Sequence, residues 1–218
     1  MDLRVSDDPS ADAAVWIARR LRDAVRRRGA ASLAVSGGST APPMFEVLAT
    51  LDVPWRQVTV WQVDERVVPD GDPERNAGQL DLLPAKGKPM PVTSKDLRAA
   101  AARYGRSLPE QFDVVHLGLG PDGHTASWPA GHDVLASTRP VEAIGVFNGF
   151  ERMTLTPPVV NHARSRVMLT FGADKAPMVE RWFLRDPELP VTRLKRTGTI
   201  VFADPSAAAD LPLPERHL

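Results

Sequence analysis

The chain has 218 residues, 43% of them hydrophobic, so it is long enough to bury one large core. Its 27 lysines and arginines equal its 27 aspartates and glutamates, so overall charge does not attract it to nucleic acid or to an anionic membrane. The chain contains no cysteine, which excludes disulfides, thiolate metal sites and a cysteine nucleophile and is typical of a reducing compartment.

The N-terminal region predicts a cytoplasmic protein whose first helix is amphipathic. Met1 to Arg4 carry charge where a signal peptide needs an apolar core, and no apolar run is long enough to span a bilayer. Asp8 then offers a helix start and Gly29 a helix stop. Apolar residues recur between them at helical spacing: Ala13, Ile17, Leu21 and Val25. Arg26 to Arg28 suit the carbonyl end of this helix, so we interpret them as a solvated helix end rather than a nucleic-acid patch.

The rest of the chain alternates predicted strands with predicted helices. The strands are Ser32 to Ser36, Gln57 to Asp64, Phe112 to Gly118, Val141 to Phe147, Arg166 to Phe171 and Thr199 to Phe202. The helices are Ala41 to Leu51, Leu97 to Leu108 and Lys175 to Leu184. This order predicts an α/β fold with three layers: a mostly parallel, Rossmann-like sheet with helices on both faces.

We expect a single domain over residues 1–218, with room for a small lobe. Several of the 21 prolines cluster between Pro84 and Ser94, which predicts a rigid loop there. Others lie near the C-terminus, where we expect a frayed tail over residues 210–218.

The first candidate site is the loop that follows the strand predicted at Ser32 to Ser36. Two glycines and hydroxyl residues lead from that strand into a helix, in the order Ser36, Gly37, Gly38, Ser39, Thr40. Backbone N–H groups at such a helix start can bind a phosphate, and the glycines let the anion approach closely. The alternative is a tight turn in which Ser39 or Thr40 caps the helix.

Charged residues follow two further predicted strands. Arg66 can hold a phosphate or a developing oxyanion, and Asp64 can orient a base or a cation. The alternative for this segment is a surface ion cluster. Lys175 stands at a helix start, where the helix dipole disfavours a cation. A nearby anion explains that lysine, and so does simple exposure to solvent.

The candidate base is His124, in a glycine-punctuated loop directly after a short apolar strand. Ligands of open α/β sheets bind beyond the carboxyl ends of the strands, so we expect this imidazole to face substrate. A lone histidine is more often a core or surface residue, but here four strand ends present phosphate or proton chemistry to one sheet edge. The other histidines lack clustered partners, so we expect no metal and no cofactor: His116, His132, His162 and His217.

Six sequence blocks, spread over about residues 10 to 209, together resemble one family. They are Ser36-Gly37-Gly38-Ser39-Thr40, Asp64-Glu65-Arg66, Asn76, Gly118-Leu119-Gly120-Pro121-Asp122-Gly123-His124-Thr125-Ala126-Ser127, Arg152-Met153-Thr154-Leu155-Thr156 with Val160-Asn161, and Gly172 with Lys175. In this order they are similar to the 6-phosphogluconolactonases of the glucosamine/galactosamine-6-phosphate isomerase superfamily. The deaminases of that superfamily have segments resembling MDEY and GPDGHIAF. Arg66 and the Thr125-Ala126-Ser127 segment therefore favour the lactonases.

The resemblance implies hydrolysis of 6-phosphoglucono-δ-lactone to 6-phosphogluconate, the second step of the oxidative pentose phosphate pathway, without a metal. His124 would activate water with no covalent intermediate and return the proton to the ring oxygen, while Arg66 or backbone N–H groups stabilise the oxyanion. The Ser36 to Thr40 loop would bind the phosphate together with Arg66 and Lys175. Asp64 and Asp122 would have orienting roles. The implied partner is a small sugar phosphate lactone, and no oligomeric partner is specified.

Two other functions stay open at this point. An amino-sugar-6-phosphate deaminase or isomerase would use the same fold with Asp64 as proton shuttle, and a sugar-phosphate sensor would bind without turnover. The chain also departs from the usual family pattern in three segments that border the pocket. They are Trp128 to Gly131 in place of Leu-Phe-Pro-Gly, a compact Leu83 to Lys95, and Phe147 to Glu151 in place of a proline-rich segment.

Overall fold

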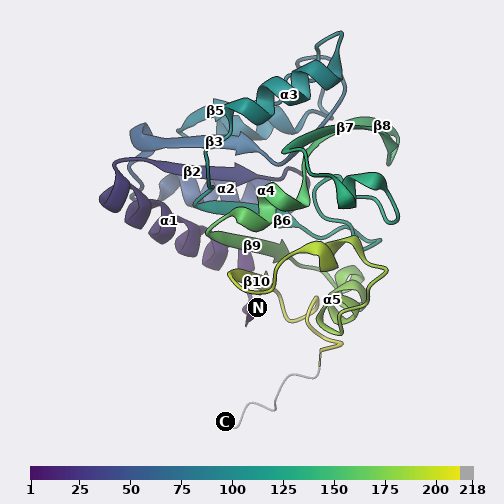
Figure 1. Cartoon of the computed structure of the whole chain (residues 1–218). Coiled ribbons are helices and arrows are strands. Elements are labelled where there is room, and N and C mark those ends of the chain that lie inside the picture. Colours follow the sequence, from purple (N-terminus) through teal and green to yellow (C-terminus); the bar gives the residue numbers. More distant parts are fainter. Residues whose placement is uncertain (212–218) are drawn as a thin grey trace, which may run out of the picture.

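The computed structural model describes residues 1–211, which form two β-sheets surrounded by helices (Figure 1). The larger sheet is parallel and has the order β1-β10-β9-β6-β2-β3-β5. Its strands are β1 (Asp2–Val5), β2 (Ala31–Val35), β3 (Val58–Gln62), β5 (Lys86–Lys88), β6 (Val114–Gly118), β9 (Ser165–Thr170) and β10 (Thr199–Ala203). The smaller, antiparallel sheet contains β4 (Asp64–Arg66), β8 (Phe150–Leu155) and β7 (Val141–Phe147). Most of the predicted tail at 210–218 lies outside the described residues.

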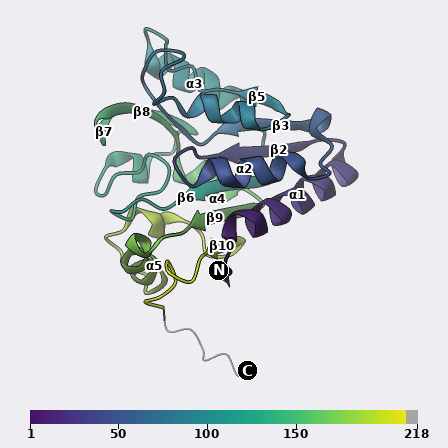
Figure 2. The ribbon, with the colours of Figure 1, turned by 180° about the vertical axis from the view of Figure 1, so that it is seen from behind.

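Helices cover both faces of the large sheet, which confirms the predicted three-layer α/β architecture. Figure 2 shows α1 (Pro9–Arg28) and α2 (Ala41–Thr50) side by side on one face. Three helices pack into the core on the other face: α3 (Leu97–Ser107), α4 (Pro157–His162) and α5 (Ala176–Phe183). Short 3-10 turns lie at Trp55–Gln57, Asn76–Leu82, Asp133–Ala136, Ala173–Lys175 and Pro190–Arg193. Within residues 1–211, every helix is too short or too polar to cross a membrane.

The central strands are buried on both faces because alternate side chains enter two separate cores. In β2, Leu33 and Val35 pack with α1 and α2, whereas Ala34 belongs to the core on the side of α3, α4 and α5. In β6, Val114 and Val115 divide between the two cores in the same way. Strands of this kind read as continuous apolar runs, which is why they were predictable from sequence.

Strands β2 and β6 are neighbours at the point where the order of the sheet reverses. From β2 the chain proceeds outward through β3 to β5, whereas from β6 it proceeds through β9 to β10 on the other side. Val35 pairs with His116 at the carboxyl ends of the two strands, and the Ser36 N–H donates to the His116 carbonyl at 3.1 Å. Ligands of open α/β sheets bind at such a switch point. The loops after Val35 and Gly118 therefore start side by side where a ligand is expected.

The structure corrects the strand predicted from Gln57 to Asp64. Gln57 ends a 3-10 turn, β3 stops at Gln62, and Asp64 begins β4 in the other sheet. Val63 joins the two sheets, because its N–H donates to the Val35 carbonyl at 2.8 Å and its carbonyl accepts from the Leu155 N–H at 2.7 Å. These bonds link residues that are far apart in the chain, so the local pattern did not reveal the break.

Several elements were missed by the sequence analysis: β1, β4, β5, β8 and α4. The segment from Pro84 to Ser94, predicted only as a loop, contains the short edge strand β5, which pairs with Thr59 to Trp61. Strand β8 was missed because it carries Glu151 and Arg152 among its first residues. β7, predicted with the right bounds, pairs antiparallel with β8 outside the parallel sheet.

His116 is a buried histidine that should make stability depend on pH. It is fully buried in β6 beside the Phe45 ring, and within residues 1–211 neither of its ring nitrogens has a hydrogen-bond partner. Burial lowers the pKa of His116 from 6.5 to about 4. Between these two pH values the unfolded chain binds a proton at His116 and the folded protein does not, so protonation favours unfolding. The free energy of unfolding is therefore unaffected by His116 above pH 6.5 and decreases as the pH falls toward 4.

Replacing His116 by leucine removes this titration and the two unpaired nitrogens. The free energy of unfolding of His116→Leu, minus that of the wild type, is expected to increase by about 2 kcal/mol between pH 7 and pH 5. Urea unfolding at the two pH values measures this difference, and all other titrating groups cancel in it. An equal difference at both pH values would contradict the assignment.

Candidate functional site

A cavity of about 290 Å³ lies beyond the carboxyl ends of β2 and β6, next to the β7–β8 hairpin. It brings together residues that the sequence analysis took from separate segments: Ser36, Gly37, Gly38, Ser39, Thr40, Asp64, Arg66, His124 and Lys175. Asp122 contacts His124 from outside this lining. Other lining residues had no role assigned from sequence: Asn76, Gly118, Leu119, Gly120, Pro121, Ala126, Asn148 and Arg152.

The loop from Ser36 to Thr40 enters α2 without a side-chain cap. Thr40 is the N-cap residue, and among the described residues its side chain makes no capping hydrogen bond. Gly38 has φ 97°, which favours glycine, and a Cβ on Gly37 would lie 2.4 Å from the Asn76 side chain. The capped turn considered as an alternative is therefore not observed. Because α2 begins Ala41-Pro42-Pro43 and proline has no backbone N–H, the N–H groups available to an anion here are those of the Gly37 to Thr40 loop.

His124 is paired with an aspartate of its own loop and lies close to a glycine of that loop. Its Nδ1 pairs with the Asp122 carboxylate, which also accepts from the His124 backbone N–H at 3.2 Å. Partial burial opposes the effect, but the hydrogen bond and charge interaction with His124 lower the pKa of Asp122 below its usual value, so it is ionised at neutral pH. A Cβ on Gly120 would lie 2.1 Å from the imidazole ring, so this glycine is what lets the backbone pass beneath it. With Nδ1–H directed to Asp122, Nε2 carries the free lone pair.

Asp64 is a buried carboxyl at the edge of the cavity. It accepts a hydrogen bond from the Ser127 hydroxyl at 2.8 Å, and Arg152 lies 3.9 Å from the same oxygen. Burial raises the pKa of Asp64, while Ser127 and the charge of Arg152 oppose that rise. Asp64 is therefore engaged by Ser127 and Arg152 at the cavity wall.

The cations of the cavity differ in their ion pairs and in their burial. Arg66 pairs with Glu74, and its guanidinium lies 5.3 Å from the centre of the Phe150 ring. Lys175, at the N-cap of α5, forms an ion pair with the neighbouring Asp174 at 3.2 Å. Arg152 is the most buried of these cations and was missed as a functional candidate. The signal was available, because Arg152 directly precedes the run Met153-Thr154-Leu155, and an arginine beside buried residues needs a polar partner.

Glu65 organises the loop behind the site. Its fully buried carboxylate accepts from the backbone N–H groups of Asn76 and Ala77, both at 2.8 Å, and from Arg75 Nε at 3.2 Å. It also accepts from Gln62 Nε2 at 2.7 Å. These bonds place Asn76 against Gly37 and so define one wall of the cavity. The sequence did not single out Glu65, since three of its partners, Arg75, Asn76 and Ala77, lie ten or more residues further along the chain.

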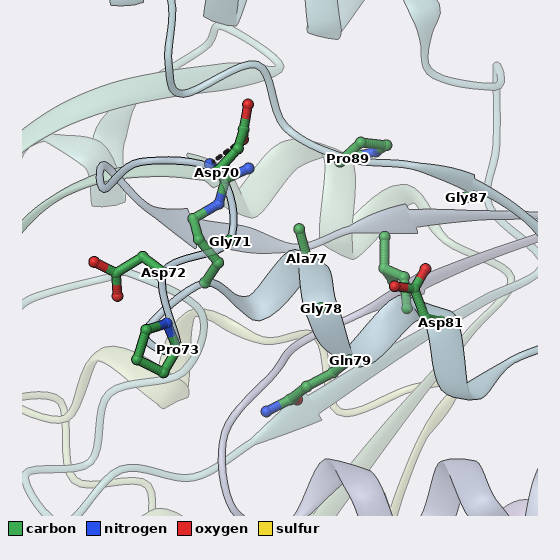
Figure 3. Close-up of a pocket in the computed structure, with 12 residues that line it drawn as sticks. Asp70, Gly71, Asp72, Pro73, Ala77, Gly78, Gln79, Asp81, Gly87 and Pro89 are labelled. Carbon is green, nitrogen blue, oxygen red and sulfur yellow. Dashed lines mark hydrogen bonds and ion pairs between the residues drawn. The ribbon is translucent and has the colours of Figure 1, made fainter.

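A larger hollow, of about 720 Å³, lies along the 3-10 turn at Asn76–Leu82 and is less suited to a phosphorylated ligand (Figure 3). Figure 3 shows the Asp72 and Asp81 carboxylates at its two sides. Asp70 also lines it, and Arg75, which is the cation of this lining among the described residues, is already paired with Asp70 and Glu65. Such a surface repels an anion, so the smaller cavity is the better candidate site.

Comparisons with known proteins identify the family of this chain. The family model of glucosamine-6-phosphate isomerases/6-phosphogluconolactonase matches residues 5–202. The chain belongs to this family. A 6-phosphogluconolactonase of Mesorhizobium japonicum is 37% identical over 80% of this chain and 81% of its own length. One of Synechocystis is 34% identical over 75% of each chain. The crystal structure of a 6-phosphogluconolactonase from Shewanella baltica has a TM-score of 0.84 at 28% identity, covering 94% of this chain and 97% of that one.

Family membership explains the fold and the order of the motifs, but the family holds two chemistries. Isomerases and lactonases both belong to the family, so membership alone does not choose between the two reactions. The relatives named above are lactonases. For this chain, the residues of the site must distinguish the two reactions.

Proposed function

We propose that this protein hydrolyses 6-phosphoglucono-δ-lactone to 6-phosphogluconate in the oxidative pentose phosphate pathway. The observation that carries the proposal is the imidazole of His124, paired through Nδ1 with an ionised Asp122, in the cavity that the Ser36 to Thr40 loop also lines. A general base and an anion-binding loop in one small cavity suit a substrate with a reactive carbonyl and a phosphate.

The phosphate is bound by the backbone N–H groups of the Gly37 to Thr40 loop, with Lys175 as the cationic partner. This binding makes no bond to the reacting atoms. Its effect is to hold the lactone carbonyl next to His124, so that the base and the reacting carbon are already positioned in the bound complex.

The chemical steps follow from the neutral imidazole. Nε2 of His124 takes a proton from a water molecule as its oxygen attacks the lactone carbonyl carbon, which gives a tetrahedral oxyanion. Arg152, Arg66 or loop N–H groups stabilise that charge. The bond from the carbonyl carbon to the ring oxygen then breaks, and His124 returns its proton to that oxygen. The product is the open-chain acid, and no covalent enzyme intermediate is formed.

Asp122 and Asp64 have orienting roles in this proposal. Asp122 keeps the proton of His124 on Nδ1 and stabilises the imidazolium that forms during attack. Asp64 holds Arg152 toward the cavity and is itself held by Ser127. Its engagement with Ser127 supports hydrolysis over isomerisation, because a carbon-acid proton shuttle needs a carboxylate that is free to reach substrate.

The first experiment measures acceleration of lactone opening above the rate in water. The lactone is generated in place by enzymatic oxidation of glucose 6-phosphate, and 6-phosphogluconate formation is followed with native and heat-denatured protein. Acceleration by the native protein alone supports the proposal. Ammonia release from glucosamine 6-phosphate would establish the deaminase instead, and binding of 6-phosphogluconate without turnover would establish the sensor.

Replacing Lys175 by methionine should raise KM for the phosphorylated lactone by about tenfold and change kcat much less, since the phosphate does not react. Glucono-δ-lactone, which has no phosphate, is the matched substrate, and its kcat/KM should be the same for Lys175→Met and wild type. Steady-state kinetics on both lactones make the comparison. An equal loss on both substrates would remove Lys175 as a phosphate ligand.

A further inference from the structure

The tip of the β7–β8 hairpin lies against both the candidate base and the arginines of the site. The Phe147 ring meets the His124 imidazole edge-to-face, with ring centres 5.0 Å apart and planes at 88°. Asn148, the next residue, lines the cavity.

We propose that Phe147 is a positioning residue that holds the His124 ring in its productive orientation. This inference rests on the proposed function. Asp122 alone is a weak restraint, because its side chain is 51% exposed and a solvated pair of this kind exchanges readily with water. Gly120 leaves room beneath the ring rather than restraining it. Phe147 supplies the remaining contact and shields one side of the imidazole from water.

The hairpin is built to hold Phe147 in place. Phe147 pairs with Phe150 across a two-residue turn, in which Asn148 and Gly149 have φ 49° and 83°. Positive φ at both central positions is the signature of a tight type I′ turn, for which Asn-Gly is a preferred sequence. The tip is therefore a preformed structure.

The arginines of the site also contact the tip of the hairpin. Arg152 Nε donates to the Phe147 carbonyl at 3.2 Å, and its guanidinium lies 5.8 Å from the centre of each ring, Phe147 and Phe150. Arg66 lies 5.3 Å from the Phe150 ring. One hairpin thus fixes the positions of His124 and these arginines relative to one another. Removing the Phe147 ring should therefore slow the chemical step.

The test compares Phe147→Leu and Phe147→Tyr with a matched control. Phe183→Leu removes a half-buried phenylalanine from another edge-to-face pair, with Trp182, at the far end of α5. Thermal melting first establishes that each variant is folded. Phe147→Leu is expected to lower kcat about tenfold with little change in KM, by the same factor on the phosphorylated and unphosphorylated lactones. Phe147→Tyr and Phe183→Leu should both keep wild-type kcat.

Three results would overturn the inference: an unchanged kcat in Phe147→Leu, an equal loss in Phe147→Tyr, or an equal loss in Phe183→Leu. The first would show that no ring is needed at this position, the second that an aromatic ring here does not restore turnover, and the third that loss of any half-buried phenylalanine slows turnover. Failure of the proposed function looks different, because the wild type itself would then not accelerate lactone hydrolysis.

Discussion

Replacing His124 by alanine is expected to lower kcat/KM for the phosphorylated lactone by about 10² or more. The variant keeps the phosphate loop and the cations, so the lactone still binds, but no group remains to take the proton from water. KM should therefore change little while kcat falls. Asp122→Asn should show a smaller loss of the same kind, because it removes the charge that stabilises the imidazolium and not the base itself.

The control for His124 is His162→Ala. His162 is exposed at the end of α4 and is not among the residues that line the cavity, so its replacement should leave the rate unchanged. Rates are measured against spontaneous hydrolysis of the same lactone sample, since the substrate opens in water unaided. If His124→Ala retains wild-type kcat, the protein remains an enzyme but its base must be sought elsewhere in the cavity.

The largest expected effect on stability comes from Glu65→Ala. The substitution leaves the buried guanidinium of Arg75 without this carboxylate and removes the acceptor for the backbone N–H groups of Asn76 and Ala77. Removing one partner of a buried ion pair costs about 3–5 kcal/mol. For a chain of this size we expect the melting temperature to fall by roughly 10 °C.

Glu74→Ala provides the comparison for Glu65. Glu74 also pairs with an arginine, Arg66, but its side chain is 48% exposed, so its loss should cost less than about 1 kcal/mol. Urea unfolding of both variants gives the two free energies. Similar losses would mean that the Glu65 network contributes no more than a surface ion pair. Because Glu65 places Asn76 against Gly37, its variant should also bind the phosphorylated lactone more weakly.

The catalytic candidates were predictable because each lies next to a strong local signal. The glycines around His124 and those between Ser36 and Thr40 interrupt apolar strands, and such interruptions at strand ends are typical of ligand loops. Lys175 stood out because it begins a helix. The structure brings these residues into one cavity, while their individual roles remain predictions for the experiments above.

Other parts of the site depend on contacts that no local pattern records. Ser127 reaches Asp64 across 63 positions of sequence, and Phe147 reaches His124 from a different sheet. Val63 divides an apparently continuous strand because it bonds to β2 on one side and β8 on the other. These pairings depend on which strands become neighbours. The order of the strands in turn depends on the burial of both faces of the sheet.

The sequence by itself determined the alternating α/β architecture, the glycine loop after β2 and the position of the candidate base, since periodicity and glycine placement act over a few residues. Only the tertiary structure decided that Asp64 and Arg66 belong to a second sheet, that Arg152 and the hairpin tip complete the cavity, and that Glu65 holds its wall. The physical reason is that charge compensation and side-chain orientation are set by neighbours in space, which the chain brings together only when its two cores are formed.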